Sequence, residues 1–202
     1  MSPLDSSRTN QTAGFTLIEA MIAMALVGLI LTKLTIVMTE ARRAHRNESV
    51  TMALEDQAAQ VLDRIAFAII GSHADTIDPG VGAPFSTDEL TFQVSMGVED
   101  GEVVFGEPEQ IGTRGDGSQL YWGQNMGAAE ERIVVWCNSV SEMLEGELLN
   151  GLDDNDNDLD DELGLSFDMD GKSITIRLTL VRTDGQGGRT EVTEQTTVTC
   201  RN

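Results

Sequence analysis

The sequence predicts an α+β protein in which one long N-terminal helix is followed by a β-rich C-terminal part. Two observations carry this prediction. Residues 16–71 contain no proline and keep a helical pattern, which at 1.5 Å per residue would make a helix roughly 80 Å long. Beyond it, short segments alternate between apolar and polar residues and are separated by turn residues, as strands of an antiparallel sheet are.

The first half of the helix, residues 15–38, is apolar on all sides. Charged residues are absent from Ala20 to Thr32, and only Lys33 interrupts the apolar run before Glu40. About twenty such residues suffice to cross the hydrocarbon core of a membrane. This half is therefore predicted to lie in lipid or in the core of a fibre.

The second half, residues 39–72, is amphipathic and is predicted to cover a sheet. Its apolar residues recur at steps of three and four, while most of its charged residues lie off that stripe. The stripe consists of Val50, Leu54, Ala58, Val61, Ile65 and Ala68 or Ile69. The simplest way to bury this stripe is to pack it on an antiparallel sheet formed by residues 73–202, the β-rich head that is expected to lie outside the membrane. Gly71 and the Pro79-Gly80 pair end the helical pattern.

Four segments of the head are predicted to be strands. Residues 90–94, 133–137 and 174–180 alternate, and a last strand covers about residues 191–200. Residues 183–189 contain Asp-Gly and Gly-Gly pairs, which are typical of a hairpin connection.

The formal net charge of -21 limits the partners of the protein. An acidic surface repels nucleic-acid phosphates, so no nucleic-acid partner is expected, whereas cations are attracted. The sequence contains no convincing nucleophile and base pair, phosphate-binding loop or zinc pattern. The protein is therefore predicted not to be an enzyme, with no catalytic residues.

The N-terminal residues resemble a known processing signal. Residues 14–20 read Gly-Phe-Thr-Leu-Ile-Glu-Ala, which is similar to the class III signal of type IV pilins and type II secretion pseudopilins. The resemblance implies that prepilin peptidase removes the leader, residues 1–14, by cutting between Gly14 and Phe15, and methylates the new terminal amine. It also implies the lollipop fold of that family. An ordinary secretory signal fits worse, because no small-residue cleavage site follows the apolar run.

Within this resemblance, Glu19 is the expected assembly residue. A carboxylate costs about 2.5–3.5 kcal/mol when it is buried near the centre of a bilayer, so its presence suggests a function. The family implies that it pairs with the Phe15 amine of a neighbouring subunit. The expected partners are other pilin subunits and prepilin peptidase.

The resemblance also implies a location. The protein would be inserted once in a bacterial inner membrane with its head in the periplasm, and would then join a cell-surface pilus or a periplasmic pseudopilus. Charge bias alone favours the opposite orientation, because Arg42, Arg43 and Arg46 follow the apolar segment. We give the specific motif precedence over this bias.

The two cysteines, Cys137 and Cys200, are predicted to form a disulfide. In an exported domain a pair of cysteines usually makes one bridge, and no metal-type spacing with histidine accompanies either residue. A bridge that closes so long a loop could contribute about 4 kcal/mol. The alternative is two buried free thiols.

An Asp/Asn loop, residues 150–164, is predicted to bind structural Ca²⁺. Oxygen-bearing side chains recur at alternate positions, and Ca²⁺ takes six to eight oxygen ligands. Asp158 stands where calcium loops of the EF-hand type usually have glycine, and Gly164 stands in the twelfth position, where a glutamate is usual. A shifted register and a solvated loop without an ion remain alternatives. The predicted ligands are Asp153, Asn155, Asn157, the Leu159 carbonyl, Asp161 and Glu162; the shifted register would use Asp154, Asp156, Asp158 and Asp160.

The sequence thus predicts a minor pilin-like structural subunit that is assembled into, or primes, a type IV pilus. The acidic insertion and the Arg201-Asn202 ending are similar to those of PilW-type minor pilins. A type II secretion pseudopilin is the alternative within the family. Two alternatives of other classes are a calcium-dependent adhesin or binding module and a membrane-tethered domain that never polymerises.

Overall fold

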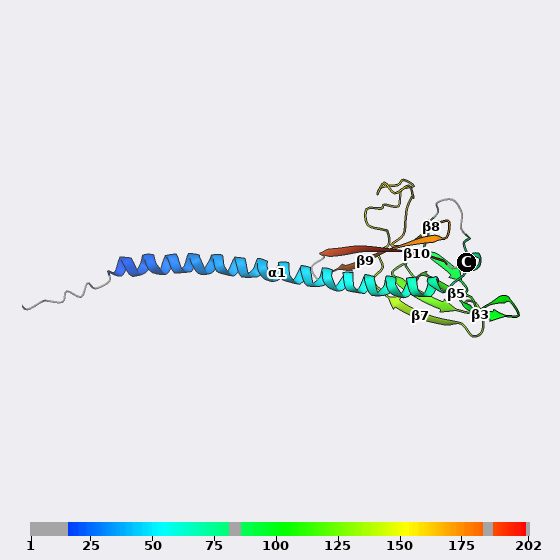
Figure 1. Cartoon of the computed structure of the whole chain (residues 1–202). Coiled ribbons are helices and arrows are strands. Elements are labelled where there is room, and N and C mark those ends of the chain that lie inside the picture. The colour runs from blue at the N-terminus through cyan, green and yellow to red at the C-terminus, as the bar shows by residue number, and fades with distance from the viewer. Residues whose placement is uncertain (1–15, 81–85, 184–187, 201–202) are drawn as a thin grey trace, which may run out of the picture. The chain divides into compact units, whose positions relative to one another are not determined.

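The structure is a computed structural model that describes residues 16–80, 86–183 and 188–200. The chain divides into two compact units, residues 1–46 and residues 47–202, and each is considered by itself. One helix and ten strands are described, together with a 3₁₀ turn, η1 (Ala74–Thr76). The predicted α+β class is confirmed (Figure 1).

The first unit consists of the N-terminal part of helix α1 (Leu17–Ile70). The helix is long and apolar enough to cross a membrane: its most apolar 18-residue window has a mean hydropathy of 2.3, and none of that window is buried within the structure. Threonine hydroxyls inside this part need a partner in lipid, where water is absent. Thr32 donates to the carbonyl of Gly28 at 2.8 Å, and Thr35 donates to that of Leu31 at 2.9 Å.

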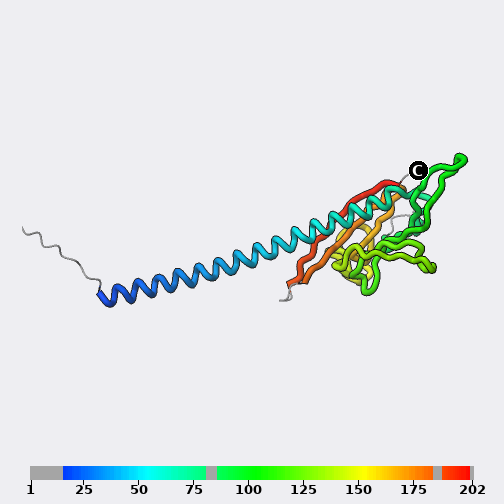
Figure 2. Tube along the Cα trace, turned by 90° about the horizontal axis from the view of Figure 1, so that it is seen from below, coloured from blue at the N-terminus to red at the C-terminus, as the bar shows by residue number. Residues whose placement is uncertain are grey.

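In the second unit, the C-terminal part of α1 lies alongside the strands of the head (Figures 1 and 2). The predicted apolar stripe is the buried face, because its members join the sheet residues in one hydrophobic core. The charged residues that lie off the stripe, such as Glu55 and Asp63, are exposed. The buried helix residues are Leu54, Ala58, Val61, Leu62, Ile65 and Ile69.

The described strands form two four-stranded sheets and one hairpin, all antiparallel. The first sheet has the order β1-β8-β9-β10, the second has the order β2-β5-β6-β7, and β3 pairs with β4. The predicted antiparallel pairing is confirmed, and the strands are divided between these two sheets and the hairpin. The bounds are β1 (Ser86–Thr87), β2 (Glu89–Phe92), β3 (Ser95–Glu99), β4 (Glu102–Phe105), β5 (Glu109–Arg114), β6 (Gln119–Gln124), β7 (Arg132–Cys137), β8 (Leu165–Asp170), β9 (Ser173–Thr183) and β10 (Arg189–Thr199).

The longest pairing joins β9 and β10 over eleven residues each, from Arg189 opposite Thr183 to Thr199 opposite Ser173. The alternating residues Ile174, Ile176 and Leu178 of β9 are buried and face the core. The predicted strands at residues 133–137, 174–180 and 191–200 correspond to β7, β9 and β10. Most of the predicted hairpin connection, residues 184–187, lies outside the described residues.

The hairpin of β3 and β4 was not predicted, although its turn has a clear sequence signal. Asp100 and Gly101 have φ values of 50° and 88°, and Glu99 pairs with Glu102 across them. Two consecutive residues with positive φ define the type I′ turn, for which Asp-Gly is a preferred pair. The hairpin leaves Met96 and Val98 exposed.

The single tyrosine, Tyr121 on β6, provides a direct test of the packing of the second sheet. Its hydroxyl donates to Oε1 of Gln110 at 3.0 Å and faces Glu89. Burial raises the pKa of Tyr121 to about 12, with further contributions from the charges of Glu89 and Asp88.

We therefore expect the tyrosinate absorbance of the folded protein to titrate near pH 12, and that of the guanidinium-unfolded protein near pH 10.0. The pKa of Tyr121 is higher in the folded state, so the contribution of its buried neutral phenol to the free energy of unfolding is complete below pH 10.0. This contribution is lost as the pH rises toward 12. An ultraviolet pH titration measures both midpoints. A folded-state midpoint equal to the unfolded one would contradict the described burial of Tyr121.

Candidate functional site

The N-terminal motif lies where α1 begins. Gly14 and Phe15 lie outside the described residues. Thr16 precedes the helix, and its Oγ1 accepts a hydrogen bond from the backbone N–H of Glu19 at 3.3 Å. This contact is the N-cap half of a Thr-x-x-Glu capping box. Glu19 thus lies in the first turn, where the positive end of the helix dipole stabilises a carboxylate.

The Asp/Asn loop, residues 150–164, lies between β7 and β8 and is held in a strained backbone conformation. Asp156, Asp158 and Asp161 have φ values of 60°, 68° and 52°. Left-handed geometry disfavours residues with a side chain, but aspartate tolerates it better than most. Asp158 therefore adopts the geometry for which glycine is usual.

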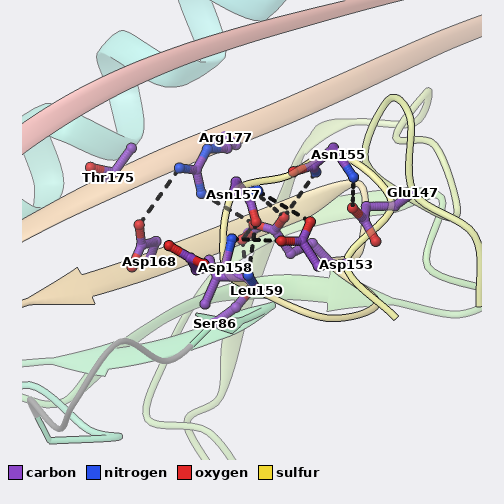
Figure 3. A network of polar contacts seen from close by, with 12 residues as sticks. Ser86, Glu147, Asp153, Asn155, Asn157, Asp158, Leu159, Asp168, Thr175 and Arg177 are labelled. Atoms are coloured by element: carbon purple, nitrogen blue, oxygen red, sulfur yellow. Dashed lines mark hydrogen bonds and ion pairs between the residues drawn. The ribbon is translucent and has the colours of Figure 1, made fainter. Parts of the chain in front are cut away.

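Two carboxylates of the loop bind backbone N–H groups. The Asp153 carboxylate accepts from the N–H of Asn157 at 3.1 Å and from that of Asp158 at 2.7 Å (Figure 3). Burial acts to raise the pKa of Asp153, but the backbone hydrogen bonds outweigh it and the pKa is lowered. Asp161 accepts from the N–H groups of Asn150 and Gly151 at 2.8 and 2.9 Å.

Glu162 anchors the loop to the first sheet. Its side chain is almost fully buried, and its Oε1 accepts from Arg177 of β9 at 3.1 Å and from Ser166 at 3.2 Å. Its Oε2 accepts from the side-chain amides of Asn155 at 3.2 Å and Asn157 at 2.5 Å. Arg177 thus supplies the positive charge that a buried carboxylate requires.

Glu147, which the sequence analysis missed, approaches the same loop. Its side chain is 5% exposed, and its Oε1 accepts from the backbone N–H of Asn155 at 3.1 Å. Burial raises the pKa of Glu147, and the charges of Glu162 and Asp154 raise it further. Glu147 lies outside the alternating Asp/Asn pattern, so the spacing of the sequence could not indicate it.

The expected calcium ligands are near one another in the loop, but they do not form a single coordination shell. Among the described residues, no three His, Cys, Asp or Glu side chains are placed so that they could hold a metal ion. Asp153 and Asp161 face backbone N–H groups, and Glu162 faces Arg177. The side chain of Leu159 is buried and anchors the loop to the interior of the head. Calcium binding with the expected ligand set therefore stays a prediction.

The expected disulfide between Cys137 and Cys200 is not formed, because both are free and buried. The Cys137 thiol accepts from the Gln57 side chain at 3.2 Å, whereas Cys200 lies close to Ser72, just past the end of α1. From Gln57 to that end the helix rises by about 20 Å, far beyond the span of a disulfide. Burial raises the pKa of both thiols, which disfavours the reactive thiolate.

Comparison with known proteins identifies the N-terminal segment. Residues 9–32 match the family model described as the prokaryotic N-terminal methylation motif. No curated protein and no solved structure matches the chain. The matched segment includes the expected cleavage position and the apolar half of the helix as far as residue 32. At residues 9–32, the chain is therefore similar to proteins that carry the prokaryotic N-terminal methylation motif.

Proposed function

We propose that the protein is a minor pilin-like structural subunit, cleaved after Gly14 and assembled through its apolar helix into a type IV pilus-like filament. The observation that carries this proposal is the methylation motif at residues 9–32, which continues directly into the apolar part of α1. The motif supports processing by prepilin peptidase and assembly with other pilins.

The apolar helix needs two successive environments, and this supports assembly. Its large side chains are exposed from Leu17 to Met38. Before assembly, lipid would cover them, because the segment is long enough to span a membrane. After extraction from the membrane, only a comparable apolar surface could replace lipid, and identical helices of neighbouring subunits provide one.

The acidic head favours a minor subunit over the main repeating one. Along a filament, copies of the same head would be adjacent, and the full sequence has a formal net charge of -21. Like charges at such a spacing repel one another, so a few copies among less acidic subunits are more favourable than an unbroken row. A type II secretion pseudopilin shares the motif and the helix, and is the second candidate within the family.

Fractionation of the native organism tests this proposal. Cells are sheared, and the protein is followed by immunoblot in the sheared filaments, the periplasm and the inner membrane. We expect it in the filament fraction, alongside the main pilin, and absent from that fraction in a strain without prepilin peptidase. Recovery with a secretion apparatus would favour the pseudopilin instead. Confinement to the membrane in both strains would contradict assembly.

A further inference from the structure

Two oxygen atoms on the buried side of the Asp/Asn loop have no hydrogen-bond donor among the residues that the structure describes. They are Oε2 of Glu147 and Oδ1 of Asn155, and both are inaccessible to solvent. The two residues are direct neighbours, because the N–H of Asn155 donates to Oε1 of Glu147 (Figure 3). A buried acceptor without a partner destabilises the fold, and a carboxylate oxygen does so most strongly.

The charge around these two atoms is one-sided. The segment from Ser141 to Gly171 contains twelve acidic residues and no lysine or arginine. The charges of Glu162 and Asp154 both act on Glu147. Two arginines reach this region from β9 and β10, but Arg177 contacts Glu162 and Asp168, and Arg189, which lines a pocket together with Glu147, contacts Glu191. The chain thus gathers oxygen atoms around Glu147 and Asn155, and more negative charge than Arg177 and Arg189 offset.

We propose that a single Ca²⁺ binds between Glu147 and the Asp/Asn loop, with Oε2 of Glu147 and Oδ1 of Asn155 as protein ligands. A hard cation satisfies acceptors that no N–H or O–H group reaches. The remaining ligands come from other oxygen atoms of the loop and from water. This proposal does not depend on the processing or the assembly of the chain.

The donor set favours Ca²⁺ over Mg²⁺. Ca²⁺ accepts carboxylate, amide and backbone oxygens together in a flexible shell, whereas Mg²⁺ demands octahedral geometry and keeps most of its water. Asn155 is placed for this role by its own amide, which donates to Glu162 and leaves the oxygen free. In this proposal Glu162 orients the ligand Asn155 and does not contact the ion itself. The sequence analysis had expected Glu162 to be a ligand.

The test measures Ca²⁺ binding and thermal unfolding of the full chain in detergent micelles, after EDTA treatment and dialysis. CaCl₂ is titrated by calorimetry, and unfolding is followed by tryptophan fluorescence. Glu147→Gln removes the ligand charge but keeps the shape of the side chain. We expect it to weaken Ca²⁺ binding by about tenfold or more. The matched control is Glu145→Gln, two residues away with an exposed side chain, which should bind as the original protein does.

The sign of the stability change separates a metal ligand from a residue with a structural role only. In EDTA, Glu147→Gln should unfold at the same temperature as the original protein or at a higher one, because the buried unpaired charge has been removed. In Ca²⁺, the original protein should gain stability and the variant should gain little. MgCl₂ in place of CaCl₂ should give a smaller gain for the original protein.

Variants of Asn155 test the second ligand independently. Asn155→Asp keeps an oxygen at the ligand position and loses the amide that donates to Glu162, so Ca²⁺ binding should persist. Asn155→Ala loses both, and binding should fall. If Ca²⁺ raised the unfolding temperature of Glu147→Gln as much as that of the original protein, the proposal would be overturned. The absence of any gain at millimolar Ca²⁺ would also overturn it, with a buried water as the partner of Glu147 in that case.

Discussion

Gly164→Ala is expected to unfold the head or to destabilise it severely. A Cβ atom at Gly164 would lie 2.0 Å from the carbonyl oxygen of Ser141 and 2.7 Å from its carbonyl carbon. Both atoms belong to the backbone, so no rotation of a side chain can relieve the clash. Overpacking of a core typically costs about 1–3 kcal/mol, and a fixed backbone neighbour places this substitution at or above that range.

The close approach at Gly164 is part of the attachment of the loop to the first sheet. The carbonyl of Gly164 accepts from the N–H of Thr179 at 2.7 Å, and the carbonyl of Thr179 accepts from the N–H of Ser141 at 2.9 Å. The segments before and after the Asp/Asn loop therefore meet beside β9. Separating them by the width of a methyl group would break these hydrogen bonds as well.

Denaturant unfolding of the full chain in detergent, followed by tryptophan fluorescence, measures this effect. Gly80→Ala is the matched control, because the nearest atom to its added Cβ would be the Ile77 carbonyl oxygen at 3.9 Å. The control should unfold at a midpoint close to that of the original protein. Equal midpoints for Gly164→Ala and Gly80→Ala would contradict the described path of the chain.

Glu19→Ala is expected to leave the protein cleaved and inserted in the membrane but nearly absent from filaments. In the assembled fibre, the proposed partner of Glu19 is the terminal amine of a neighbouring subunit. Removal of one member of a buried ion pair costs about 3–5 kcal/mol, because the other charge is left unpaired. A cost of 3 kcal/mol corresponds to more than about a hundredfold in an equilibrium constant.

The free energy that Glu19 contributes to the stability of its own helix is too small to explain such an effect. A carboxylate in the first turn of a helix contributes about 0.3–1 kcal/mol. The capping contact uses the backbone N–H of Glu19 and the hydroxyl of Thr16, so an alanine side chain preserves it. Glu19→Ala should therefore leave α1 intact and remove only the pairing between subunits.

The ratio of the protein in sheared filaments to that in membranes measures incorporation. Glu40→Ala is the matched control, because Glu40 is an exposed glutamate of the same helix that pairs only with the exposed Arg43 among the described ion pairs. Its incorporation should equal that of the original protein. Normal incorporation of Glu19→Ala would remove the assembly role from Glu19.

The helix and its buried face could be predicted because their causes are local. The steps of three and four from Leu54 to Ile69 place these residues on one side of any α-helix. The strand β9 was equally readable, since Ile174, Ile176 and Leu178 alternate with polar residues. The division of the strands between two sheets could not be predicted from the sequence, because strand pairing depends on contacts between segments far apart in the sequence.

The residues of the candidate site show the same limit more sharply. Arg177 reaches Glu162 only because the register of β8 on β9 places Leu165 opposite Leu178, next to Arg177. Glu147 approaches Asn155 through the return path of the loop, which no periodicity encodes. The spacing of Cys137 and Cys200 likewise says nothing of their positions near opposite ends of the packed half of α1.

Intact-mass analysis of the native protein, recovered from sheared filaments, tests the central claim most directly. The account predicts a mature chain that starts at Phe15, carries one methyl group on its terminal amine and contains both cysteines as thiols. A protein that begins at Met1, with an unmodified amine and outside any filament, would contradict it.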